Sequence, residues 1–284
     1  MTSLSIVIPA RDEAAGLRKV LPSLVQLYPE AEIIVVNDGS LDDTSAICTE
    51  FGVREGCHPY AKGNGAAIKS GARAATGDVL VFMDGDGQHD PAAIARLLDE
   101  IERGYDLVVG ARKGIGSQAS MARWSANTLY NKFSSGMVGH QIDDLTSGFR
   151  AARRERFMEF LYLLPNGFSY PTTSTMAFFR AGYSVSFIPI EVAPRLGTSH
   201  INLLRDGVRF FLIIFKIGSL YSPLKIFFPL SILLALLGMA NYAYTYLVDE
   251  RFTNMSAMML LASIMVFLIG LVSEQITNLM YKDH

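Results

Sequence analysis

The sequence predicts an α/β protein with a parallel sheet, followed by a hairpin of two membrane-spanning helices. Through the first half, short apolar runs alternate with segments that have apolar residues at helical spacing, which indicates βαβ units. Near the C-terminus, the apolar runs 227–248 and 257–281 are each long enough to cross a bilayer, for which about 20 residues suffice. Half of the 284 residues are hydrophobic. This excess is concentrated near the end, so a soluble part should precede a membrane part.

Four apolar runs have the length and composition of buried parallel strands. They are residues 4–9, 32–36, 78–83 and 106–109. Helical patterns separate them, and parallel strands need such crossover connections. The expected helices are 14–27, one that starts at 42–44, a small-residue helix within 58–77, and 91–103, which Pro91 opens at its first position.

The acidic segment 84–90 lies where the third strand ends and a helix begins. Ligands of open α/β sheets bind outside the carboxyl ends of the strands. Because side chains alternate along an extended segment, we expect Asp84, Asp86 and Gln88 on one face, with the intervening glycines leaving room for a ligand. Their oxygens suit Mg2+ or Mn2+ when substrate phosphates complete the coordination. A solvated acidic turn is the alternative for this pattern taken alone.

Acidic residues also follow the first two expected strands. Asp12 and Glu13 come after the first strand and Asp38 after the second, so all should converge with Asp84 and Asp86 on one edge of the sheet. The segment after the first strand lacks the G-x-G-x-x-G fingerprint, and no Walker loop is present, which excludes a nicotinamide oxidoreductase and a P-loop enzyme.

Composition excludes further classes. A net charge of -2 argues against a general nucleic-acid binder. The two cysteines, Cys48 and Cys57, indicate neither a disulfide framework nor a metal site. We expect no signal peptide, because the first apolar stretch is short and runs into charged residues.

Five motifs in order resemble family-2 glycosyltransferases of GT-A fold. They are residues 8–13, 36–44, 62–65, 84–88 and 144–150. The resemblance is to the branch of dolichol-phosphate mannose synthases and polyprenyl-phosphate glycosyltransferases, and it covers about the first 200 residues. It implies a Rossmann-like, mostly parallel sheet and a metal-dependent, inverting transfer from a nucleotide sugar.

The resemblance also implies roles for single residues. The nucleotide-sugar pocket would be formed by Pro9, Glu13, Asp38, Lys62 and Asp84, with Asp38 facing the base and Asp84 near the ribose and sugar. Asp86 and Gln88 would bind the metal, and Asp84 and Asp86 would be catalytic. The family often has an aromatic residue and Asn where this chain has Arg11 and Asp12, so the donor is left as a UDP- or GDP-sugar.

On the acceptor side, arginine forks suit the phosphate of a polyprenyl phosphate. The resemblance assigns Arg112 and Arg195 to this phosphate and to catalysis, supported by Ser199. Arg123, on the helical pattern 120–133, is a further candidate, with a surface or helix-packing role equally open. An acceptor phosphate is already ionised and needs no strong general base. An acceptor hydroxyl would need a general base. Asp144 is then the candidate base, and the alternative for Asp144 is a purely structural role.

We expect three parts: a catalytic domain 1–200, an amphipathic interfacial helix 201–223 and a transmembrane hairpin 224–284. Cations gather on the side of the two termini, at Arg205, Arg209, Lys216, Lys225 and Lys282, whereas Arg251 lies on the other side. The positive-inside rule therefore predicts a protein integral to a membrane of the bacterial inner-membrane type, with the catalytic domain and both termini in the cytoplasm. Glu274 near a membrane end should have an interfacial or hairpin-packing role, with function as the alternative.

The sequence leaves three functions open. The leading hypothesis is sugar transfer to a polyprenyl phosphate at the cytoplasmic face. The second is transfer to another membrane acceptor or processive polysaccharide synthesis, although Gln118 and Arg123-Trp124 have the wrong spacing for a Gln-x-x-Arg-Trp motif. The third is a non-catalytic membrane module that binds nucleotide sugars. A homo-oligomer is possible in each case.

Overall fold

A computed structural model describes residues 3–112, 121–167, 169–192, 215, 218–219 and 221–281. Its contacts divide the chain into two units. The first unit comprises Met1–Gly136 with His140–Leu203, and the second comprises Met137–Gly139 with Leu204–His284. Each is described separately.

The first unit is built on a seven-stranded sheet of order β3-β2-β1-β4-β6-β5-β7. The strands are β1 (Leu4–Ala10), β2 (Glu32–Asn37), β3 (Arg54–Cys57), β4 (Val79–Phe82), β5 (Leu107–Arg112), β6 (Arg150–Arg153) and β7 (Val185–Ile190). Strands β1 to β4 pair in parallel, as do β5 and β7, whereas β6 lies antiparallel between β4 and β5. The predicted α/β fold with a mostly parallel sheet is confirmed.

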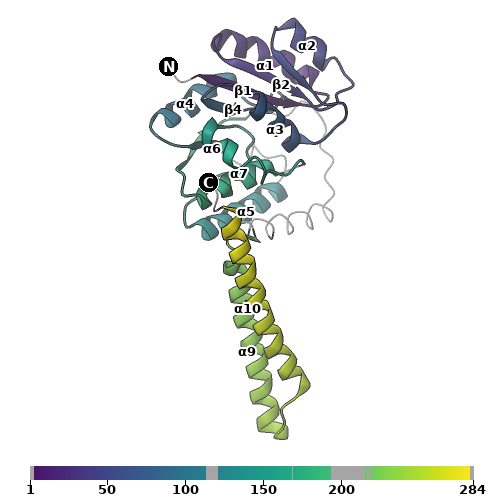
Figure 1. Cartoon of the computed structure of the whole chain (residues 1–284), viewed down its shortest axis with the longest axis vertical. Helices are drawn as coiled ribbons and strands as arrows, with labels where there is room; N and C mark the ends of the chain where they lie inside the picture. Colours follow the sequence, from purple (N-terminus) through teal and green to yellow (C-terminus); the bar gives the residue numbers. More distant parts are fainter. Residues whose placement is uncertain are drawn as a thin grey trace. The chain divides into compact units, whose positions relative to one another are not determined.

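The four predicted helices lie between the strands β1 to β5, and further helices follow β5 and β6 (Figure 1). They are α1 (Ala14–Leu27), α2 (Thr44–Glu50), α3 (Asn64–Ala74), the short 3-10 helix η1 (Pro91–Ala93), α4 (Ile94–Glu102), α5 (Met121–Val138), α6 (Arg154–Glu159) and α7 (Tyr170–Arg180). Fully buried Ile6 and Ile8 of β1 belong to one core cluster with residues of α1, α2 and α4. The intervening Val7 faces α3, where a Cβ added at Gly71 would lie 2.2 Å from Val7 Cγ1. Alternate side chains of β1 therefore pack against helices on opposite faces of the sheet.

The second unit contains two long apolar helices, α9 (Leu224–Asp249) and α10 (Asn254–Met280), joined by a short turn. Both are long and apolar enough to cross a membrane, and they run side by side as a hairpin (Figure 1). Close packing occurs at Gly238, where an added Cβ would lie 3.1 Å from Leu260. The predicted amphipathic segment 201–223 lies mostly outside the described residues.

Polar contacts hold the two ends of this hairpin. Near the turn, the Asn241 side chain donates to Ser256 Oγ at 2.9 Å. At the opposite end, Glu274 Oε2 accepts from Ser222 Oγ and from the backbone N–H of Leu224, each at 3.1 Å. Glu274 therefore satisfies an N–H at the start of α9 that has no partner within its own helix, in agreement with the expected hairpin-packing role.

Candidate active site

The acidic segment follows β4 at the carboxyl edge of the sheet, but it is a turn rather than the extended segment expected. Gly85 and Asp86 form the turn. Asp84, Asp86 and Gln88 are nevertheless all half-buried, whereas Gly85 and Gly87 between them are buried. The three polar side chains thus share the accessible side of the turn.

The expectation that the two glycines make room for a ligand is wrong. A Cβ at Gly85 would lie 3.2 Å from the carbonyl oxygen of Pro9, and one at Gly87 would lie 3.3 Å from Lys19 Cδ. Gly87 also has a φ of +74°, which favours glycine. These glycines allow the turn to pack against β1 and α1.

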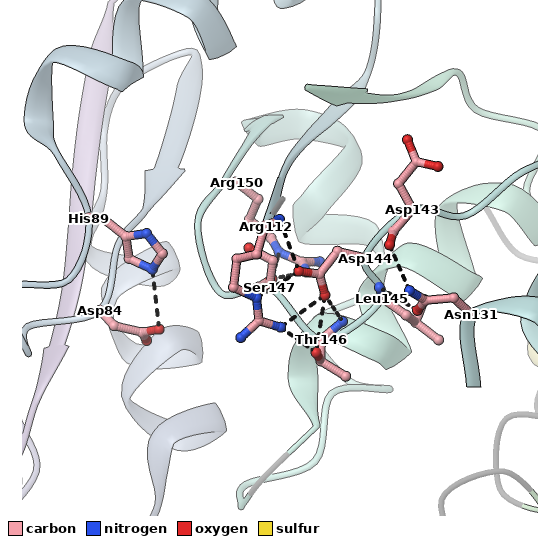
Figure 2. Close-up of polar contacts among 10 residues, drawn as sticks. All are labelled: Asp84, His89, Arg112, Asn131, Asp143, Asp144, Leu145, Thr146, Ser147 and Arg150. Atoms are coloured by element: carbon pink, nitrogen blue, oxygen red, sulfur yellow. Dashed lines mark hydrogen bonds and ion pairs between the residues drawn. The ribbon is translucent and has the colours of Figure 1, made fainter. Parts of the chain in front are cut away.

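Asp84 is held between His89 and Gly148. Its Oδ2 lies 3.9 Å from His89 Nε2 (Figure 2), and the His89 ring stacks on Phe149 with centroids 4.9 Å apart. A Cβ at Gly148 would lie only 2.7 Å from Asp84 Oδ2. Burial would raise the pKa of Asp84, but the interaction with His89 and the charge of Arg112 lower it. Asp84 is therefore an anion at neutral pH.

Arg112, at the end of β5, forms a two-pronged ion pair with Asp144 (Figure 2). Nε donates to Oδ2 at 2.7 Å, Nη2 donates to Oδ1 at 2.9 Å, and Nη2 also donates to Thr146 Oγ1 at 2.6 Å. Burial opposes ionisation of Asp144, but the Arg112 hydrogen bonds and charge lower its pKa. A carboxylate held this way is a poor general base. Nη1 keeps its N–H groups without a partner among the described residues.

Arg150 is completely buried beside this cluster. It donates to the Pro171 carbonyl and Ser174 Oγ at 2.8 Å and to Thr175 Oγ1 at 3.1 Å. These partners are neutral, and burial lowers the pKa of Arg150. Sequence reasoning placed Arg150 only within a motif. In the structure it ties β6 to the start of α7 and adds positive charge behind the site.

Asp38, expected to face a nucleobase, is held by protein donors. Its Oδ1 lies 2.7 Å from His58 Nδ1 and accepts from the Lys62 N–H at 2.8 Å, and its Oδ2 accepts from the Gly63 N–H at 2.7 Å. His58 Nε2 in turn lies 2.8 Å from Ser70 Oγ. Burial opposes ionisation, but these bonds lower the pKa of Asp38. Sequence reasoning missed His58, although it directly follows the edge strand β3.

The glycines of the Lys62 loop pack against the backbone of residues 165–167. A Cβ at Gly63 would lie 2.5 Å from the Asn166 carbonyl oxygen, and one at Gly65 would lie 2.0 Å from that of Pro165. The Ala66 N–H, in the first turn of α3, donates to the Asn166 carbonyl at 2.9 Å. Lys62 itself is exposed. Its backbone belongs to the Asp38 network, and its ammonium lies 5.7 Å from the centroid of the Tyr60 ring.

The segment after β1 supplies the remaining predicted residues. Pro9 is buried in β1 opposite Val36 of β2, and half-buried Glu13 precedes α1. Asp12 adopts a φ of +54°, a conformation that Asp tolerates better than most residues, and its Oδ1 accepts from the Leu41 N–H at 2.8 Å. Asp12 therefore joins the loops after β1 and β2.

The donor set fits a divalent cation that is shared with a substrate. Among the described residues, no group of three or more His, Cys, Asp and Glu could hold a metal ion alone. Asp86 and Gln88 supply a carboxylate and an amide oxygen, which suffices where substrate phosphates provide the other ligands. Arg195 and Ser199 lie outside the described residues. Arg123 belongs to α5, but its side chain is also outside them.

A mostly parallel sheet of this topology, with an acidic turn after β4, is a GT-A-like fold. Residues 5–161 match glycosyl transferase family 2, and the chain belongs to that family. Residues 222–279 match the GtrB C-terminal hairpin. The resemblance noted from the motifs is thereby confirmed for the first part of the chain, and the second match falls on the predicted hairpin 224–284.

Several relatives carry names from the polyprenyl-phosphate branch. The chain is 29% identical over 212 residues to a polyprenol monophosphomannose synthase of Mycolicibacterium smegmatis, covering 69% of this chain and 80% of the relative. It is 30% identical to an undecaprenyl-phosphate mannosyltransferase of Micrococcus luteus, covering 69% and 86%. An undecaprenyl-phosphate 4-deoxy-4-formamido-L-arabinose transferase of Klebsiella pneumoniae is 32% identical over 161 residues, and the match covers 53% of this chain and 49% of that relative.

Solved structures show the same fold. Glucosyl-3-phosphoglycerate synthase from Mycobacterium tuberculosis, in complex with Mn2+, uridine diphosphate and glucosyl-3-phosphoglycerate, superimposes with a TM-score of 0.60 at 25% identity. The match covers 77% of this chain and 79% of that chain.

Proposed function

We propose that this protein transfers a sugar from a nucleotide sugar to the phosphate of a polyprenyl phosphate. The observation that carries the proposal is the arrangement at the sheet edge: Asp84 and the turn with Asp86 and Gln88 follow β4, and the Arg112–Asp144 pair closes the end of β5. The relatives named for transfer to polyprenyl or undecaprenyl phosphate support this acceptor.

On the donor side, Asp38 is proposed to build the nucleotide pocket by holding the backbone of Lys62 and Gly63 in place. Pro9 and Glu13 would border the same pocket and Asp84 would face the ribose and sugar. Asp86 and Gln88 would bind Mg2+ or Mn2+ on the diphosphate, and the Mn2+ and uridine diphosphate in the related structure support this assignment. The metal would stabilise the charge that develops on the leaving diphosphate.

On the acceptor side, Arg112 is proposed to orient the phosphate through Nη1 while Asp144 fixes its guanidinium. Arg195, Ser199 and Arg123 are proposed to support it. A phosphate oxygen attacks the anomeric carbon, the bond to the diphosphate oxygen breaks, and a new carbon–oxygen bond forms with inversion. No proton transfer to a base is required, which agrees with the lowered pKa of Asp144. Positioning and charge stabilisation then supply the catalysis.

The proposed organisation is a catalytic domain 1–200, an interfacial helix 201–223 and a membrane hairpin 224–284. The match to the GtrB hairpin and the two apolar helices support integration into a membrane. The excess of cations on the side of the termini supports a cytoplasmic catalytic domain, as in a bacterial inner membrane.

The test is a donor screen with the purified full chain in nanodiscs, Mn2+ or Mg2+, and undecaprenyl phosphate. Radiolabelled UDP- and GDP-sugars are supplied one at a time, and transfer into the organic phase is counted. One labelled sugar on lipid, released by mild acid as a monosaccharide, is expected. Polymer would indicate a processive synthase instead, and nucleotide-sugar binding without transfer would indicate a binding module.

A further inference from the structure

The first turn of α1 packs directly against the acidic turn. A Cβ added at Gly16 of α1 would lie 2.1 Å from the carbonyl oxygen of Gly85 and 2.8 Å from the carbonyl carbon of Asp86. Both contacts are to backbone, which cannot move aside as a flexible side chain can. Only glycine at this position of the helix allows the two backbones to approach this closely.

One turn further along α1, Lys19 holds the other end of the acidic turn. Its ammonium donates a hydrogen bond to the Gly87 carbonyl oxygen at 2.9 Å. Gly87 has a φ of +74°, and its Cα side faces the Lys19 stem and Gly16. A Cβ at Gly85 would lie 3.2 Å from the Pro9 carbonyl oxygen of β1 and 3.5 Å from Leu17 Cδ2 of α1. Residues 85–87 thus pack against both the end of β1 and α1.

The packed backbone 85–87 includes one proposed metal ligand, Asp86, and the other, Gln88, follows it directly. Asp86 Oδ1 accepts from the Gln88 N–H at 3.1 Å, which ties the two ligand residues to each other. Because only these two ligands are proposed from the part of the chain that the structure describes, the affinity for a cation depends on how well their oxygens are held in place before binding.

We propose that Gly16 and Lys19 are positioning residues for the metal-binding turn. Gly16 allows the backbone of the turn to pack directly on α1, and Lys19 restrains the Gly87 carbonyl. Together they hold the oxygens of Asp86 and Gln88 so that both face one cation. Lys19 acts through this backbone and not on the reacting atoms. The assignment rests on the proposed function for the metal, and it concerns residues outside the acidic motif itself.

The test measures Mn2+ binding to the full chain in detergent by electron paramagnetic resonance of free Mn2+, with saturating UDP and, in parallel, GDP. Lys19→Met should weaken Mn2+ binding about tenfold, the lower end of what lost outer-shell partners cost metal sites. Lys19→Arg should recover part of it. Arg18→Met is the matched control, since exposed Arg18 on the same helix pairs with Glu50 at 3.2 Å, and it should leave Mn2+ affinity unchanged.

A second, metal-free measurement follows amide hydrogen exchange in peptides covering 84–90. Lys19→Met should accelerate exchange there, and Arg18→Met should not. If the wild type binds no Mn2+ with either nucleotide, the metal assignment fails, and the exchange difference still decides whether Lys19 restrains the turn. If Lys19→Met leaves exchange unchanged and Mn2+ affinity within twofold of wild type, the proposal is overturned. If Lys19→Met weakens UDP binding equally with and without Mn2+, the proposal is also overturned, because Lys19 would then bind the nucleotide.

Gly16→Ala extends the test to the second residue. It should abolish measurable Mn2+ binding, because its Cβ forces the turn away from α1. Gly56→Ala in β3 is the control for adding a methyl group, since nothing lies within 4 Å of its Cβ position. Gly16→Ala with wild-type Mn2+ affinity contradicts the proposal. If circular dichroism shows that Gly16→Ala is unfolded, the Lys19→Met measurements decide the proposal.

Discussion

Replacing Asp144 by Asn tests the ion pair that organises the acceptor side. The Asp144 side chain is 5% exposed and that of Arg112 is 25% exposed, so the substitution leaves a largely buried guanidinium without its counter-charge. Loss of one partner of a buried pair costs about 3–5 kcal/mol. Because Arg112 still reaches water, we expect the lower end, about 3 kcal/mol. For a domain of this size that corresponds to a fall in Tm of about 6–12 °C.

The assay is thermal unfolding of the full chain in detergent at pH 7, followed by circular dichroism. Asp143→Asn is the matched control, because the exposed Asp143 next to it accepts from the Gln141 amide and its charge is solvated. Its Tm should stay within about 2 °C of wild type, as surface substitutions usually do. A Tm for Asp144→Asn that is also within 2 °C of wild type would refute the reasoning. If Arg112 orients the acceptor, the variant should also raise the KM for undecaprenyl phosphate more than that for the donor.

Three further predictions follow from the site. The pKa of Asp38 is lowered in the folded state from its ordinary value of 3.8. The ionised Asp38 therefore stabilises the fold fully above that value, and this stabilisation is lost as the pH falls through the folded-state pKa. Tm should be constant from about pH 7 to 5 and fall below about pH 4, and the fall should be less steep in Asp38→Asn. Gly65→Ala should destabilise the chain by about 2 kcal/mol or more, since its Cβ would lie 2.0 Å from the Pro165 oxygen, whereas Gly56→Ala should not; denaturation midpoints compare them. Asp86→Ala, or EDTA added to wild type, should reduce sugar transfer at least 100-fold in the radiolabel assay, and retained metal-independent turnover would contradict the mechanism.

Much of the fold was predictable because the central strands are apolar and bounded by turn residues. β1, β2, β4 and β5 were expected from their Val- and Ile-rich runs. Three strands, β3, β6 and β7, were not expected. β3 is a short edge strand with a polar sequence, and β6 is four residues long with arginine at both ends. The insertion of β6 antiparallel between β4 and β5 is a tertiary arrangement, for which a four-residue run carries no periodic signal.

The site was predictable in location but less so in the use of its side chains. The carboxyl-end rule placed the acids after β1, β2 and β4 at one edge. Sequence alone could not show that the Asp38 oxygens bind His58 and the Lys62 loop, because these partners lie 20–25 residues away. Sequence reasoning also expected the glycines of the acidic turn to leave room for a ligand, whereas they pack against β1 and α1. Such close approaches depend on packing between elements that no local pattern specifies.

The most direct test of the account is the choice of acceptor. The donor found in the screen is offered to the full chain with undecaprenyl phosphate and phosphoglyceric acid together, and labelled product is separated into organic and aqueous phases. The account predicts label in the organic phase only, lost in Asp86→Ala. Label on phosphoglyceric acid alone would contradict the assignment of a polyprenyl phosphate acceptor.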